Sequence, residues 1–295
     1  WQPRLVPDTV VVDYGLDVEL NVRTNDINDS VVVGVMTEQP KAGDDVVAIG
    51  VGTYANSKGK DFLYWLIPDK ETVYPEDYPA NINSYGDISY NDQILAALEK
   101  YGVQHLYAKD AMLEGKKTML VNNMKYDSSH WNDHGAFLCC VDLYSRLQQF
   151  DPRIRSITRE DYNVSEIIQT SLQNSHFEIH EAVPDYSLVE SHAEKKTDWL
   201  WENLFISFPN NSANHYVNPQ QADMPKILFF SDSYIHGNEH FFTENFSQTT
   251  FIHRYNCLNQ EAFEYYVDFL DPDIIIFENP ERSLPINLYQ EFEKP

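Results

Sequence analysis

Residues 226–233 read KILFFSDS, an apolar run that stops abruptly at polar residues. This pattern predicts a buried strand that ends in a turn, with Ser233 in the turn. A serine placed there is expected at the carboxyl edge of a sheet, where open α/β folds bind their ligands. Ser and Asp are also preferred N-caps, so residues 231–233 also fit a plain helix start.

A second segment, residues 126–137, reads YDSSHWNDHGAF and offers Asp127 and His130 as partners for Ser233. A serine hydroxyl is a poor nucleophile near neutral pH, so it needs a base within reach and a group that orients that base. The sequence therefore predicts a triad with Ser233 as nucleophile, His130 as base and Asp127 as orienting carboxylate. His130 also fits a histidine that packs on a helix beginning nearby.

Strand-like and helix-like segments alternate from about residue 60 onward. Strands are predicted at 62–67, 103–108, 226–230 and 273–277, and helices at 92–101, after residue 130 and at 260–270. Such alternation is typical of an α/β fold with a parallel sheet flanked by helices.

Other parts of the chain show a different pattern. Short alternating runs within residues 10–33 predict a small β-rich N-terminal extension, so we expect two units, 1–50 and a catalytic domain at 51–295. Residues 151–225 are polar and only weakly periodic, and residues 210–214 (NNSAN) are predicted to form a surface loop.

Composition limits the partners. The chain has 21 Lys and Arg against 46 Asp and Glu, a formal net charge of −25, and no basic cluster. Nucleic acid is excluded as a partner because phosphate binding depends on basic groups, and a strongly anionic polymer is disfavoured. The three cysteines give neither a disulfide framework nor a metal spacing, and Cys140 is expected in the core.

One motif points to a competing metal chemistry. Residues 236–240 (HGNEH) match the H-x-x-E-H zinc pattern, but Gly237 and Asn238 are poor helix formers and no third ligand is evident. His130 and His134 are four apart without the glutamate that a zinc helix needs, so His134 is expected to be exposed. We therefore expect no metal and no cofactor.

Four segments together resemble one known family. They are residues 67–76 (IPDKETVYPE), residues 130–136 (HWNDHGA), residues 232–234 (DSY), and residues 273–276 (DIII) with Glu281–Arg282. In this order they are similar to the alginate O-acetyltransferase family of SGNH-hydrolase-like proteins, over about residues 60–285. Two positions depart from that family. Ser128 stands where its triad Asp usually lies, and Ser231 stands where its nucleophile block has Gly.

The resemblance implies an SGNH-hydrolase-like fold and a specific activity. An acetyl group would pass through a Ser233 acyl-enzyme to hydroxyls of a bacterial polysaccharide, at the cell surface or in the periplasm. A membrane-bound acyltransferase would be the donor partner, and a membrane anchor is expected in an N-terminal segment outside this chain, which opens at Trp1.

Three further residues are candidates for substrate binding. Trp131 has a ring suited to stacking on a sugar or to packing in the core, and Tyr234 follows the nucleophile. Arg282 can pair with Glu281 or contact the acyl donor or the glycan. Two alternative functions remain at this stage: an acetylesterase with the same triad, and a catalytically inactive glycan-binding module, which the changes at Ser128 and Ser231 make credible.

Overall fold

The computed structural model describes residue 52 and residues 54–77, 90–100, 102–127, 129–171, 178–205, 213–254 and 260–283. The predicted extension over residues 1–50 lies outside these ranges, so the division at residue 50 stays a prediction. Within the described part of the chain, no helix is both long and apolar enough to cross a membrane.

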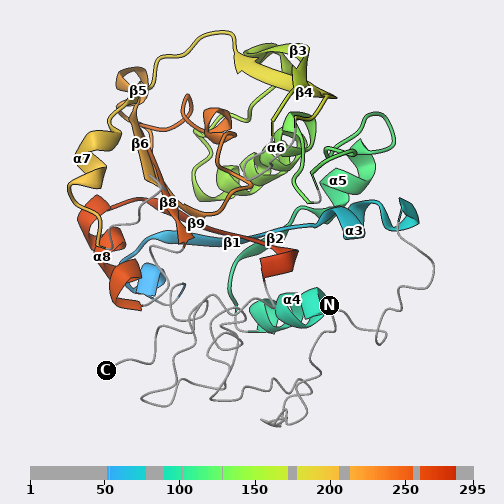
Figure 1. Ribbon diagram of the computed structural model, residues 1–295. Coiled ribbons are helices and arrows are strands. Elements are labelled where there is room, and N and C mark those ends of the chain that lie inside the picture. The colour runs from blue at the N-terminus through green and yellow to red at the C-terminus, as the bar shows by residue number, and fades with distance from the viewer. Residues whose placement is uncertain are drawn as a thin grey trace.

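One seven-stranded sheet organises the fold, with the strand order β2-β1-β9-β7-β8-β6-β5 (Figure 1). Its strands are β1 (Asp61–Ile67), β2 (His105–Tyr107), β5 (Glu194–Lys195), β6 (Ala213–Val217), β7 (Lys226–Ser231), β8 (Gln248–His253) and β9 (Ile274–Pro280). The five strands from β2 to β8 pair in parallel, which confirms the expected α/β fold.

The sheet is mixed, however, and not wholly parallel as predicted. At one edge β6 pairs antiparallel with β8, and β5 pairs antiparallel with β6. The sequences of these two strands, EK and ANHYV, contain no apolar run that would mark them as strands. Asn214, expected in a surface loop, lies buried in β6, whereas residues 210–212 fall outside the described ranges.

Helices cover both faces of the sheet. They are α3 (Lys70–Val73), α4 (Tyr90–Lys100), α5 (Lys109–Gly115), α6 (Asp133–Phe150), α7 (Thr197–Trp201) and α8 (Gln260–Leu270), with short 3-10 helices η1 (Pro75–Asp77), η2 (Arg159–Asp161), η3 (Pro219–Gln221), η4 (Glu239–Phe241) and η6 (Glu281–Ser283). The helices predicted around 92–101, after residue 130 and at 260–270 correspond to α4, α6 and α8.

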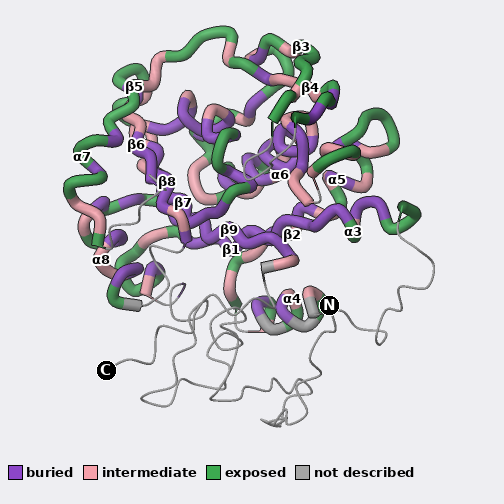
Figure 2. Tube along the Cα trace, viewed as in Figure 1, coloured by how far each residue is buried: buried purple, intermediate pink, exposed green. Residues whose placement is uncertain are grey.

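The central strands are buried on both faces, as Figure 2 shows. Successive side chains of a strand point to opposite faces, so Ile227 and Phe229 of β7 join the core under α6, whereas Leu228 and Phe230 join the core under α4 and α8. Cys140 is fully buried on the α6 side, in the core position expected for it.

Residues 151–225 contain a β-hairpin that the sequence did not predict. Strands β3 (Tyr162–Gln169) and β4 (Glu181–Leu188) pair antiparallel in a separate two-stranded sheet. Most residues of β3 are exposed, so it lacks an apolar run. Tyr162 and Tyr186 nevertheless pack their rings against Phe137, which fixes the hairpin on α6.

The start of α6 lies tightly against the preceding chain. The Asn132 side chain caps the helix by accepting the Gly135 N–H at 3.0 Å. A Cβ atom on Gly135 would lie 2.2 Å from the Val121 carbonyl oxygen and 3.1 Å from the Val121 carbonyl carbon. Only glycine fits here, because the contact is with backbone that cannot rotate away.

We expect Gly135→Ala to lower the free energy of unfolding by about 1–3 kcal/mol, the usual cost of overpacking. Urea unfolding measures it. Gly115→Ala is the control: its Cβ would meet the terminal Cδ1 of Leu138 at 2.2 Å, and a side-chain end can move. A loss for Gly135→Ala no larger than that for Gly115→Ala would contradict the backbone-contact explanation.

Candidate active site

Ser233 lies two residues beyond the last residue of β7, in the turn that the sequence predicts, and its side chain is exposed. No helix begins at residues 231–233, which lead into a turn where Asp232 Oδ1 accepts the Tyr234 N–H at 2.9 Å. The Ser233 hydroxyl is therefore left to face the chain across the sheet edge. Ser231, at the position where the resembled family has Gly, is the buried last residue of β7.

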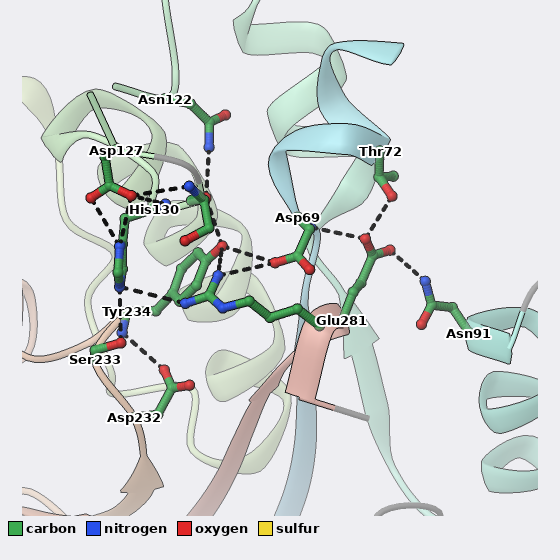
Figure 3. A network of polar contacts seen from close by, with 12 residues as sticks. Asp69, Thr72, Asn91, Asn122, Asp127, His130, Asp232, Ser233, Tyr234 and Glu281 are labelled. Atoms are coloured by element: carbon green, nitrogen blue, oxygen red, sulfur yellow. Dashed lines mark hydrogen bonds and ion pairs between the residues drawn. The ribbon is translucent and has the colours of Figure 1, made fainter. Parts of the chain in front are cut away.

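The structure brings together the three residues predicted as a triad (Figure 3). His130 Nε2 lies 2.9 Å from Ser233 Oγ. On the other side of the ring, His130 Nδ1 lies 3.0 Å from Asp127 Oδ2 and 3.1 Å from Oδ1. These distances are within hydrogen-bond range, so the arrangement can pass a proton from serine to imidazole.

Asp127 reaches the imidazole although it precedes it by three residues. Its Oδ1 also accepts the backbone N–H of Ser129 at 3.0 Å and of His130 at 3.1 Å, so the chain folds back around the carboxylate. Burial would raise the pKa of Asp127, but the hydrogen bonds from the His130 ring and from these two N–H groups outweigh it and hold the pKa well below its ordinary value. Ser128 lies outside the described residues.

Tyr234 forms the buried floor behind the imidazole. It is 1% exposed, and its ring centroid lies 5.0 Å from that of His130. Its hydroxyl is 2.7 Å from the Ser129 carbonyl oxygen and 3.0 Å from Asp69 Oδ1, and it accepts from Arg282 Nη1 at 2.6 Å. This burial makes Tyr234 a support for the site.

Arg282 projects toward the triad. Its guanidinium lies 4.4 Å from the Tyr234 ring centroid, and Nη2 is 3.5 Å from His130 Nε2. Its ion pair is with Asp69 Oδ1, at 3.1 Å, and not with Glu281 as one interpretation of the sequence had it. Adjacent residues of a 3-10 helix point about 120° apart, so Glu281 and Arg282 reach different partners.

Glu281 instead binds four donors around the ends of the strands. Its carboxylate accepts from the Asp69 N–H at 2.9 Å, from Thr72 Oγ1 at 2.6 Å and from Asn91 Nδ2 at 2.7 Å, and also from the Tyr107 hydroxyl. Three of these contacts are visible around Glu281 in Figure 3. Glu281 thereby fixes the backbone from which Arg282 extends.

Trp131 is 4% exposed and belongs to the core. Its indole N–H lies 2.9 Å from the Tyr234 carbonyl oxygen and 3.2 Å from Asn238 Oδ1. The packing interpretation of Trp131 fits this burial, and the sugar-stacking interpretation does not, because stacking needs an exposed ring face.

The HGNEH segment does not have zinc-helix geometry. Glu239 starts the 3-10 helix η4 and accepts from Asn214 Nδ2 and the Tyr216 hydroxyl, both at 2.7 Å. Among the residues that the structure describes, no group of three or more His, Cys, Asp and Glu side chains is placed to hold a metal ion. His134 was expected to be exposed, but it is half-buried and its Nδ1 lies 2.9 Å from the Tyr186 hydroxyl, because the unforeseen hairpin covers it.

Two acidic residues, Asp232 and Glu278, lie close together beneath the turn that carries Ser233. The sequence analysis did not predict this pair. Glu278 is fully buried, and its Oε2 accepts the Asp232 N–H at 2.8 Å. Burial, with the nearby Asp232 carboxylate, raises the pKa of Glu278 well above its ordinary value. Asp232 Oδ2 pairs with Arg254 Nη2 at 3.1 Å, so this turn is anchored from below.

Comparison of the fold identifies similar solved structures. PatB1 from Bacillus cereus, in a structure with a sulfonyl adduct, has a TM-score of 0.61 and 13% identity, covering 92% of this chain and 94% of that chain. A DHHW family protein from Eubacterium siraeum has a TM-score of 0.57 and 13% identity, covering 82% and 87%. These likenesses establish the shared α/β fold.

The O-acetyltransferase domain of Pseudomonas putida AlgJ also matches, with a TM-score of 0.46 and 14% identity over 88% of this chain and 84% of that chain. A score at that level supports no argument about this protein. No family model matches the sequence, and no curated protein matches it significantly.

Burial raises the pKa of Asp69 from 3.8 to about 6, against the opposing effect of Arg282. The folded state therefore keeps a proton that the unfolded chain releases between about pH 4 and 6, so ionisation of Asp69 lowers the free energy of unfolding as pH rises through this window. We expect the parent, relative to Asp69→Asn, to lose up to about 1.4 kcal/mol per pH unit there. Urea unfolding at several pH values measures the difference; a difference that is flat or rises from pH 4 to 6 would contradict this.

Proposed function

We propose that this protein is an extracytoplasmic O-acetyltransferase that moves an acetyl group through a Ser233 acyl-enzyme onto a polysaccharide hydroxyl. The observation that carries the proposal is the continuous contact from Ser233 Oγ to His130 Nε2, at 2.9 Å, and from His130 Nδ1 to Asp127 Oδ2, at 3.0 Å. The four sequence segments shared with the alginate O-acetyltransferase family support the choice of acetyl transfer over other serine chemistry.

The reaction has two balanced halves. In the first, Ser233 gives its proton to His130 Nε2 and attacks the acetyl carbonyl; the donor oxygen leaves with the proton from His130. In the second, a sugar hydroxyl gives its proton to His130 and takes the acetyl group, and His130 returns that proton to Ser233. Asp127 keeps the proton on Nδ1 and stabilises the imidazolium in both halves.

Arg282 supplies positive charge next to the reacting atoms. The Ser233 N–H is one donor for the oxyanion, and we assign the second to Arg282, whose Nη2 borders His130 Nε2 at 3.5 Å. Asp69 and Tyr234 both bind Nη1, which leaves Nη2 directed toward the triad. The guanidinium is thus held in place before the substrate arrives.

The acetyl donor and the acceptor follow from the same proposal. A membrane-bound acyltransferase supplies the acetyl group, and a polysaccharide outside the cytoplasm accepts it. The net charge of −25 favours a neutral or weakly charged acceptor. An acetylesterase would use the same triad with water as acceptor, so an acceptor sugar must be part of the test.

Turnover of a chromogenic acetate ester tests the triad. Ser233→Ala and His130→Ala are each expected to lower kcat at least about 1000-fold, and Asp127→Asn at least about 100-fold, because the three groups act as a unit. His192→Ala is the control, since His192 Nδ1 also faces a carboxylate, Glu244 Oε2 at 3.3 Å, in another loop. Adding a neutral oligosaccharide should yield an acetylated sugar by mass spectrometry.

Two results would count against the proposal in different ways. Acetate as the sole product in the presence of the sugar would make the enzyme an esterase. A parent protein that neither turns over the ester nor reacts at Ser233 with a sulfonyl fluoride would leave no nucleophile at this site.

Replacing Arg282 should affect the chemical step. We expect Arg282→Lys to lower kcat for the same ester by about 100- to 1000-fold, the usual cost of losing one oxyanion donor, with little change in KM. A lysine cannot bind Asp69 and Tyr234 and still face the triad, because it lacks the planar fork. Arg159→Lys, an exposed guanidinium over the Tyr186 ring, is the control. A loss confined to KM would assign Arg282 to substrate binding instead.

A further inference from the structure

The loop that carries Asp127 and His130 is held by hydrogen bonds from charged side chains in two distant parts of the chain. It leaves β-bridge residue Asn122 and returns at its partner Trp131. Between these ends, the backbone of the described residues forms a cross-loop bond from the Asn123 N–H to the His130 carbonyl at 3.4 Å. Such a short, irregular loop needs outside contacts to hold one conformation.

Lys70 provides the first contact. It is the first residue of α3, 8% exposed, and its Nζ donates to the Asn123 carbonyl at 2.6 Å and to the Asp127 carbonyl at 3.1 Å. One ammonium therefore joins both ends of the stretch that leads to the triad carboxylate. Among the described residues Lys70 forms no ion pair, so its charge is directed at these two carbonyls.

Glu181 provides the second contact. It opens β4, is 5% exposed, and its Oε1 accepts the N–H of Met124 at 2.7 Å and of Lys125 at 2.9 Å. These two N–H groups lie between the two carbonyls that Lys70 holds. A buried cation thus binds the carbonyls of the stretch and a buried anion binds its amides, and both are charge-assisted hydrogen bonds.

We propose that Lys70 and Glu181 are positioning residues that hold Asp127 in register with His130. Among the described residues, neither forms a hydrogen bond or ion pair with a triad side chain. Lys70 acts on the Asn123 and Asp127 carbonyls, and Glu181 acts on the N–H groups of Met124 and Lys125. The inference rests on the proposed use of the triad, and it gives roles to the segment at residues 67–76 and to the β3–β4 hairpin, which the catalytic steps do not otherwise use.

The test observes the His130 imidazole directly, by NMR of the protein with isotope-labelled histidine. The parent is expected to show a hydrogen-bonded Nδ1–H, assigned by its absence in His130→Ala. We expect Lys70→Met and Glu181→Leu to lose this signal or exchange it faster with water, while both remain folded by circular dichroism. Lys70→Arg keeps a charged donor and should retain the signal.

Matched controls separate loop positioning from the general loss of a charged hydrogen-bonding side chain; both control residues are partly buried. Lys116→Met removes an ammonium that donates to the carbonyl of Val73 in α3, the helix that begins at Lys70. The same ammonium pairs with Glu76. Glu244→Leu removes a carboxylate that accepts the N–H groups of His192 and Ala193, the same geometry in another loop. Both should leave the His130 signal unchanged.

Ester turnover gives a second readout. Lys70→Met and Glu181→Leu should lower kcat by about 10- to 100-fold, as expected for a misplaced catalytic group, with KM nearly unchanged. Where either variant fails to fold, Lys70→Gln and Glu181→Gln replace the pair, and faster exchange of the imidazole N–H is again expected.

An unchanged His130 signal in the folded Lys70 and Glu181 variants would overturn the proposal, as would an equal loss in Lys116→Met and Glu244→Leu. A parent that neither turns over the ester nor reacts at Ser233 with a sulfonyl fluoride would refute the proposed function instead. The NMR comparison would still decide whether these two residues position the loop.

Discussion

The parallel pairing of β1, β9 and β7 is the constraint on which the site depends. Ile67 of β1 is in register with Pro280 of β9, and Phe230 of β7 with Phe277 of β9, so the three strands end at one edge of the sheet. The residues that follow each strand are thereby brought together although they are far apart in sequence. Asp69 follows β1, Ser233 follows β7 and Arg282 follows β9, so the parallel pairing of these strands places the three residues near one another.

Charge burial at that edge is extensive and ordered. Arg282 is paired with Asp69, Glu281 accepts from four donors, and Asp232 is paired with Arg254 above the buried Glu278. Removing charges from water is costly unless each finds partners, so the mutual pairing of these groups favours this arrangement of the strand ends. The nucleophile turn and the arginine are in this way fixed from below before any substrate binds.

The sequence predicted those parts of the fold whose signal is local. The β7 run at 226–231 and the turn at Ser233 are marked by apolar residues that give way to polar ones, and Asp127 and His130 by their spacing. The antiparallel strands β5 and β6 and the β3–β4 hairpin were missed, since their residues are polar or exposed. The partners of Arg282 were beyond reach as well, because Asp69 lies 213 positions away and joins it only through strand pairing.

The spacing of Asp127 and His130 shows how local and distant interactions combine. An aspartate three residues before the histidine reaches Nδ1 only if the chain turns back, and the carboxylate itself closes that turn by accepting the N–H groups of Ser129 and His130. These two bonds fix the direction in which the Asp127 side chain points. The position of the carboxylate still depends on the position of the loop backbone. That backbone is held at its carbonyls by Lys70 and at its amides by Glu181. Contacts from Lys70 of α3 and Glu181 of β4 fix the position of the loop, and the turn sets only the direction of the Asp127 side chain. An aspartate three residues before the histidine is therefore compatible with a triad geometry.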